Sequence, residues 1–130
     1  PLIGDVPLGA DNLDMPMDGD RSLFPPVFFA YDSSQVNPEE AGKCEQVASY
    51  LKKGKGQGVI VEGHADERGS REYNLALGER RALAVRDYLI SLGVDSAVIQ
   101  TKSYGEEMPD NMGHDDNAWR TNRRSVFAIY

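Results

Sequence analysis

The 130-residue sequence has few of the features that staple a small protein, cross a membrane or bind nucleic acid. Cys44 is its single cysteine, which excludes an intramolecular disulfide and a cysteine-based zinc cluster. No apolar run approaches the roughly 18 residues that a membrane-spanning helix needs. Acids outnumber bases by 21 to 14, and the net charge of −7 argues against a nucleic-acid-binding surface.

The acidic excess lies mostly at the start of the chain. Residues 1–20 contain five aspartates and no base, whereas the other 110 residues contain 16 acids and 14 bases. Prolines and glycines are scattered through residues 1–22 without a helical or strand period, which predicts an acidic flexible linker. Residues 23–130 are then one domain of common size. Because the chain begins with Pro1, we expect it to be a processed or trimmed product.

Strand and helix signals alternate along residues 23–130. The predicted elements are a strand starting near residue 27, a helix over 38–53, a strand over 58–63, a helix over 71–92, a helical turn over 95–98, a strand over 99–104, a short helix over 115–121 and a strand over 124–130. The order β-α-β-α-β-(α)-β predicts an α/β fold, arranged as a two-layer α+β sandwich. Its four-stranded mixed sheet is packed by two main helices.

Local signals set the ends of the two main helices. Asn37 is expected to cap the first helix, with Pro38 at its first position and Gly54 as its stop. Ser70 is expected to cap the second helix. Apolar residues at helical spacing predict the buried stripe of the second helix as Leu75, Ala82, Val85, Leu89 and Leu92.

Short motifs for phosphate or metal binding are present but poorly placed. The glycine cluster at 54–58 follows a helix and opens a strand, the reverse of a phosphate-binding loop, so we expect a turn. His64 and Asp66 form one potential metal-ligand set, and residues 114–116 form another. The two histidines lie 50 residues apart in predicted loops, so we expect no metal and no cofactor. His64 is expected to fix its loop through a ring N–H bond to the backbone.

Catalytic arrangements are equally weak. Ser70, His64 and Asp66 lie close in sequence, but no G-x-S-x-G elbow surrounds Ser70, whose position suits a helix cap. Cys44 falls on the apolar face of the first helix, where a thiol packs rather than reacts. We therefore expect no enzymatic activity.

A set of polar residues borders the start of the second long helix. Asp66 lies in the loop before the helix, and Asn74, Leu77 and Arg81 share one helical face over two turns. A carboxylate and a guanidinium on one groove suit a zwitterion, with its ammonium against Asp66 and its carboxylate forked by Arg81.

A structural interpretation of the same residues remains open. Asp66 would be a turn residue, and the arginines of the helix would form a solvated face paired with its acids. The residues of that face are Arg80, Arg81, Arg86, Glu79 and Asp87. Arg123 and Arg124 are expected to be structural, bonding loop carbonyls or carboxylates.

Several motifs in order resemble the OmpA-like peptidoglycan-binding domain. They are GHADERGS at 63–70, YNL at 73–75, LGERRA at 77–82, SYGE at 103–106 with Pro109, and NRR at 122–124. Ala65, the LGERRA segment and the sequence GHD at 113–115 are similar to the peptidoglycan-associated lipoprotein branch of this family. The resemblance covers residues 24–130 and leaves residues 1–22 outside.

The resemblance implies non-catalytic, non-covalent binding to the meso-diaminopimelate residue of the peptidoglycan stem peptide. Asp66 would hold the ammonium of diaminopimelate, and Arg81 would hold its carboxylate. The other residues that the resemblance assigns to the site are Asn74, Leu77, Ala65, Tyr31 and Asp32.

The resemblance also implies a place at the periplasmic face of the outer membrane of a Gram-negative envelope. A lipid anchor upstream of this chain would hold the membrane, the acidic linker would be the tether, and a TolB-like periplasmic protein would be a second partner. The alternatives are a protein-interaction module of the Tol system and the wall-binding domain of a flagellar stator-type protein. A cell-wall hydrolase is disfavoured.

Overall fold

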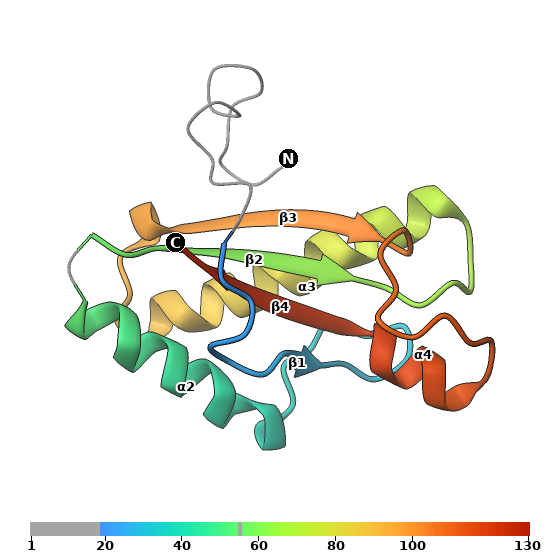
Figure 1. The fold of residues 1–130 in the computed structure, drawn as a ribbon, viewed down its shortest axis with the longest axis horizontal. Coiled ribbons are helices and arrows are strands. Elements are labelled where there is room, and N and C mark those ends of the chain that lie inside the picture. Colours follow the sequence, from blue (N-terminus) through green and yellow to red (C-terminus); the bar gives the residue numbers. More distant parts are fainter. Residues whose placement is uncertain (1–18, 55) are drawn as a thin grey trace.

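The computed structural model describes residues 19–54 and 56–130, which form a sheet with two long helices on one face (Figure 1). The strands are β1 (Val27–Phe28), β2 (Val59–His64), β3 (Ile99–Gly105) and β4 (Arg124–Ile129). The helices are α2 (Pro38–Lys53), α3 (Arg71–Ser91) and α4 (Asp116–Asn122), with a 3-10 turn, η1 (Ser96–Val98). Residues 1–18 of the predicted linker and Lys55 of the predicted turn lie outside the described residues.

The sheet has the strand order β1-β4-β2-β3. β2 and β3 run parallel, with α3 as the connection between them, and β4 is antiparallel to both β1 and β2. The predicted four-stranded mixed sheet and α+β fold are confirmed. The strand predicted over 58–63 is observed one residue later, at Val59–His64, because His64 pairs with Gly105 as the last residue of β2.

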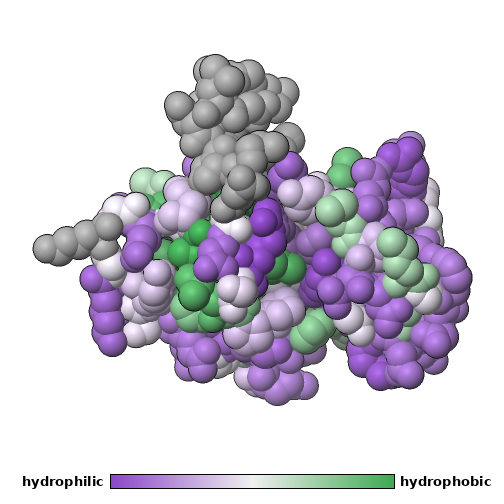
Figure 2. All heavy atoms as spheres, viewed as in Figure 1, coloured by the Kyte–Doolittle hydropathy of each residue, from purple (hydrophilic) through white to green (hydrophobic). Residues whose placement is uncertain are grey.

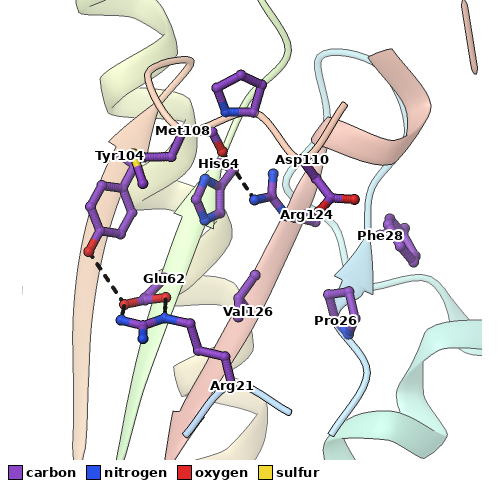
Figure 3. A pocket seen from close by; sticks show the side chains of 11 residues that line it. Arg21, Pro26, Phe28, Glu62, His64, Tyr104, Met108, Asp110, Arg124 and Val126 are labelled. Carbon is purple, nitrogen blue, oxygen red and sulfur yellow. Dashed lines mark hydrogen bonds and ion pairs between the residues drawn. The ribbon is translucent and has the colours of Figure 1, made fainter. Parts of the chain in front are cut away.

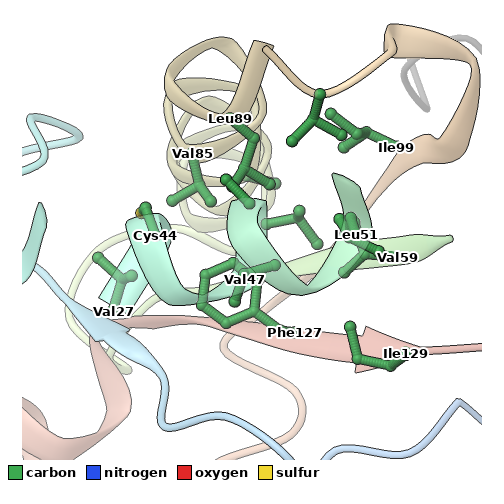
Figure 4. Close-up of a cluster of buried hydrophobic side chains, with 14 of the residues drawn as sticks. Val27, Cys44, Val47, Leu51, Val59, Val85, Leu89, Ile99, Phe127 and Ile129 are labelled. Carbon is green, nitrogen blue, oxygen red and sulfur yellow. The ribbon is translucent and has the colours of Figure 1, made fainter. Parts of the chain in front are cut away.

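The hydrophobic core lies between the sheet and helices α2 and α3 (Figure 4). Val59 and Val61 alternate along β2 toward this core, where they join Val47 of α2 and Leu89 of α3. Burying an aliphatic side chain of this size stabilises a fold by about 1.5–3 kcal/mol. Cys44 is part of the same cluster, which confirms that its thiol packs in the core, and burial raises the pKa of that thiol to about 12, which disfavours the reactive thiolate.

The buried face of α3 changes character along the helix. Val85 and Leu89 are fully buried, as the apolar stripe predicts. Leu75 is not part of this stripe, because its side chain is 51% exposed. The first turns of α3 instead face the sheet with other residues, which are Asn74, Leu77, Gly78 and Arg81.

Two glycines bring the first half of α3 against the end of β2. A Cβ atom on Gly63 would overlap the carbonyl oxygen of Gly78, and a Cβ on Gly78 would overlap the Ser103 hydroxyl. Only a residue without a side chain permits this approach of backbone to backbone. The contact sets the distance between the start of α3 and the loop after β2, where the polar residues gather.

The helix ends follow local signals with one exception. The Ser70 hydroxyl accepts a hydrogen bond from the Tyr73 N–H at 3.0 Å, as a cap should, and Gly54 ends α2. Asn37 precedes α2 as expected, but its side chain makes no capping hydrogen bond. Pro38 at the first position supplies a helical φ angle and needs no partner for an N–H, which reduces the need for such a cap.

Residues 19–26 cross the face of the sheet opposite the helices (Figure 1). Asp20 exchanges two backbone hydrogen bonds with Ile129, at 2.7 and 2.9 Å. Arg21 binds both carboxylate oxygens of Glu62 at 2.8 Å. The described end of the predicted linker thus lies against the sheet, and a domain boundary after residue 22 stays a prediction.

The surface on this side is mostly hydrophilic, with hydrophobic residues exposed in separate patches (Figure 2). Within the part of the chain that the structure describes, no helix has the length and apolarity needed to cross a membrane.

Candidate ligand-binding site

A small pocket forms where the loops after β1 and β2 meet the start of α3. The residues that line it are Tyr31, Asp32, Asp66, Arg68, Tyr73, Asn74, Leu77 and Arg81. Six of these are residues that the sequence places in a ligand site. Ala65, the seventh, is buried beside Asp66 but does not line the pocket. Segments far apart in the chain are therefore brought together around one cavity.

Arg81 is fully buried, so the interpretation of this residue as part of a solvated arginine face is wrong. Its Nε donates to the Ser33 carbonyl at 2.8 Å, and its terminal nitrogens donate to the carbonyls of His64 at 2.9 Å and Ala30 at 3.2 Å. Burial, with the nearby charge of Arg123, lowers the pKa of Arg81 to about 10, so it stays charged at neutral pH. Arg81 thus holds the loop at 30–33 against the end of β2 as well as lining the pocket.

Asp66 supplies the negative charge of the pocket and is only 5% exposed. The Arg68 backbone N–H and Nε donate to its Oδ1 at 3.0 and 3.2 Å, and Arg68 Nη2 donates to its Oδ2 at 2.8 Å. Arg123 Nη1 lies 3.6 Å from Asp66 Oδ2. Burial alone would raise the pKa of Asp66, but these hydrogen bonds and the charges of the two arginines hold it below its ordinary value.

Arg68 has a second set of contacts that the sequence analysis missed. Its guanidinium carbon lies 4.0 Å from the ring centre of Tyr31 and 4.2 Å from that of Trp119. The Trp119 indole N–H donates to Glu67 at 2.9 Å, which fixes the indole from α4. The turn Asp66-Glu67-Arg68 is a local signal for the backbone hydrogen bond, but no local signal brings Trp119 to it.

The other walls of the pocket are held by further hydrogen bonds. The hydroxyl of Tyr73, another residue that the sequence analysis missed, donates to the Asp32 carboxylate. Asp32 itself takes a left-handed conformation with φ of 54°. The Asn74 side-chain amide is buried and donates to Glu106 at 2.7 Å. Leu77 is 5% exposed and supplies the apolar wall.

The paired arginines at the start of β4, Arg123 and Arg124, have structural contacts, as expected. Arg123 Nε donates to the Phe29 carbonyl at 2.8 Å, and Arg124 donates to the carbonyls of Asn122 and Met108. Arg123 also places a second positive charge beside the Asp66 carboxylate.

His64 does not act as the sequence analysis expects. Its side chain lies on the open face of the sheet, in a groove that Glu62, Tyr104 and Arg124 also line (Figure 3). The imidazole stacks on Tyr104, its Nδ1 is buried without a hydrogen-bond partner, and the backbone carbonyl is the group that bonds, to Arg81. His114 pairs with Glu67 elsewhere. Among residues 19–54 and 56–130, no three side chains of the metal-binding types are grouped to hold an ion.

The structure is a small α+β domain in which a buried acid, Asp66, and a buried base, Arg81, line one pocket. Residues 28–123 match the OmpA family, and the chain belongs to this family.

Curated relatives of this chain are described as peptidoglycan-associated lipoproteins. The chain is 53% identical over 97 residues to the peptidoglycan-associated lipoprotein of Pseudomonas aeruginosa, a match that covers 75% of this chain and 57% of the relative. It is 47% identical over 111 residues to that of Mesorhizobium japonicum, covering 85% and 63%. The chain therefore spans about three-fifths of the length of these curated relatives.

Solved structures agree with the family assignment. The crystal structure of the peptidoglycan-associated lipoprotein from Burkholderia pseudomallei matches with a TM-score of 0.79 at 41% identity, covering 81% of this chain and 89% of that one. The C-terminal domain of Helicobacter pylori MotB matches with a TM-score of 0.75 at 23% identity, covering 82% and 84%. The second likeness is one of fold alone.

Proposed function

We propose that the pocket binds peptidoglycan without covalent chemistry, by holding the meso-diaminopimelate of the stem peptide. The observation that carries this proposal is the pair of opposite charges, Asp66 and Arg81, which line one pocket and are both nearly or fully buried. The free end of diaminopimelate carries an ammonium and a carboxylate on one carbon and so presents the complementary pair. The description of the relatives as peptidoglycan-associated supports the same ligand.

Each pocket residue has a role in this proposal. Asp66 accepts hydrogen bonds from the ammonium, and the remaining N–H groups of Arg81 donate to the carboxylate. Leu77 and Asn74 form the wall against the methylene chain. Charge-assisted hydrogen bonds of this kind contribute about 1.5–3 kcal/mol each. Because the pocket is preformed by the carbonyl contacts of Arg81, little ordering is needed on binding.

The state of Asp66 favours an anchor over a hydrolase. A general acid needs a carboxyl group whose pKa is raised toward the working pH. Hydrogen bonds and positive charges instead hold the pKa of Asp66 low, although burial opposes them. A carboxylate that is ionised at neutral pH suits retention of a cation.

The same proposal places the domain at the periplasmic face of the outer membrane, where it tethers that membrane to the wall. The relatives are described as lipoproteins and are longer than this chain, which supports a lipid anchor in sequence upstream. Tyr31, Tyr73 and Leu75 are 60%, 42% and 51% exposed, and Tyr31 and Tyr73 line the pocket itself. A TolB-like protein that covered this apolar rim would compete with the wall.

Sedimentation with purified sacculi and calorimetry with a diaminopimelate muropeptide test the proposal. Asp66→Asn keeps the shape of the side chain and removes its charge. We expect an affinity loss of at least about 30-fold, corresponding to about 2 kcal/mol or more. Asp87→Asn, an exposed site further along α3, is the matched control and should bind normally.

Two results would contradict the proposal. Asp66→Asn could bind the muropeptide as tightly as the unmodified chain, which would remove the assigned site. Alternatively, the chain could release soluble muropeptides from sacculi, which would make it a hydrolase.

A further inference from the structure

The carboxylate that we assign to the ligand ammonium already has a cationic partner. Arg68 contacts both oxygens of Asp66, through Nε at 3.2 Å and Nη2 at 2.8 Å. Asp66 is 4% exposed at its side chain, whereas Arg68 is 32% exposed. An incoming ammonium must therefore share Asp66 with Arg68 or displace it.

Arg68 is held in place by more than Asp66. The rings of Tyr31 and Trp119 lie 4.0 and 4.2 Å from its guanidinium carbon, and Glu67 fixes the indole of Trp119. A cation between two aromatic faces is attracted to both. The two aromatic rings thus hold the Arg68 guanidinium at the pocket independently of its bond to Asp66.

Arg81 cannot supply all the donors that a ligand carboxylate accepts. It is fully buried, and its Nε and both terminal nitrogens already donate to backbone carbonyls. One N–H on each terminal nitrogen remains. Arg68 lines the same pocket. Its Nε–H and Nη2–H groups, if released from Asp66, would supply the further donors that a ligand carboxylate accepts.

We infer that Asp66 and Arg68 exchange partners when the ligand binds, so that Asp66 takes the ligand ammonium and Arg68 joins Arg81 on the ligand carboxylate. A simple cation would displace Arg68 and leave it unpaired, whereas a zwitterion satisfies both groups. Arg68 is then the residue that makes the pocket select a zwitterion over a cation. This inference rests on the proposed function, because it takes diaminopimelate as the ligand.

Calorimetry with three disaccharide-tripeptides tests the exchange. The third residue is meso-diaminopimelate, diaminopimelate with its side-chain carboxyl amidated, or lysine. The unmodified chain should prefer the first over the other two by at least about tenfold. In Arg68→Met, the diaminopimelate peptide should bind more weakly and the lysine peptide more tightly, which reduces the preference by about tenfold. Arg71→Met, at an arginine paired with Glu107 outside the pocket, should keep the original preference.

The outcomes separate this inference from the proposed function. If Arg68→Met weakens all three peptides equally, or changes none, the exchange is wrong and Arg68 only supports the loop. If the unmodified chain does not bind the diaminopimelate peptide, or Asp66→Asn binds it normally, the proposed function fails as well.

A measurement on the unmodified chain is independent of how Arg68→Met folds. The ¹⁵N resonance of Arg68 Nε should shift when the diaminopimelate peptide is added and should shift differently with the lysine peptide. An Arg68 Nε resonance that both peptides leave unmoved would overturn the exchange.

Discussion

The burial of His64 predicts a specific loss of stability in mild acid. The side chain is 4% exposed, and its Nδ1 has no hydrogen-bond partner. Burial, together with the positive charges of Arg124 and Arg21, lowers the pKa of His64 to about 3. A histidine in an unfolded chain titrates near a pKa of about 6.5. Between these two pKa values, the unfolded chain binds a proton that the folded chain excludes.

The sign and size of the effect follow from this difference. Because the pKa of His64 is lower in the folded chain, the contribution of neutral His64 to the free energy of unfolding is complete above about pH 6.5. This contribution is lost as the pH falls toward the folded pKa. Between pH 7 and pH 5, the free energy of unfolding should fall by about 2 kcal/mol. That is a large share of the roughly 5–15 kcal/mol of a typical domain.

Urea unfolding at the two pH values, followed by the fluorescence of Trp119, measures this loss. His64→Phe keeps the aromatic stack on Tyr104 and removes the titrating nitrogen, so its stability should change little between pH 7 and pH 5. His114→Gln, at an exposed histidine, should keep the full loss. The reasoning is refuted if His64→Phe shows the same loss as the unmodified chain.

Close packing and buried charge also set the outcome of three other perturbations. Gly63→Ala would drive a methyl group into the Gly78 carbonyl, so the free energy of unfolding measured in urea should fall by about 3 kcal/mol or more. The control Gly42→Ala lies in open space on α2, and its free energy of unfolding should rise by about 0.5–1 kcal/mol. Arg81→Lys cannot reproduce the three carbonyl contacts, so calorimetry should show a muropeptide affinity at least about 30-fold lower, and unchanged binding would contradict its role. Because the pKa of Asp66 lies below its ordinary value, muropeptide affinity measured by calorimetry should be unchanged from about pH 8 to pH 5, and a loss centred near pH 6 would count against Asp66.

The sequence predicts those parts of the structure that short-range signals determine. Helix α2 begins at Pro38 and ends at Lys53, as the proline at its start and Gly54 after its end indicate. Helical spacing alone predicts that Asn74, Leu77 and Arg81 share one face, and all three side chains are buried on that face.

The missed features depend on contacts between distant segments. Arg81 is buried because the loop at 30–33 turns its carbonyls toward it, and Arg68 lies against Trp119 from a helix near the end of the chain. Leu75 carries the apolar signal of a core residue, yet it is half exposed because Gly78 sets which face of α3 meets the sheet. Helical spacing cannot report which part of a helix approaches the sheet so closely.

The most direct measurement is a structure of this chain bound to a diaminopimelate muropeptide. The account predicts the ligand ammonium within hydrogen-bond distance of Asp66, about 2.7–3.2 Å, and its carboxylate at the same distance from Arg81. A stem peptide that lies elsewhere, for example in the groove beside His64 on the open face of the sheet, would contradict it.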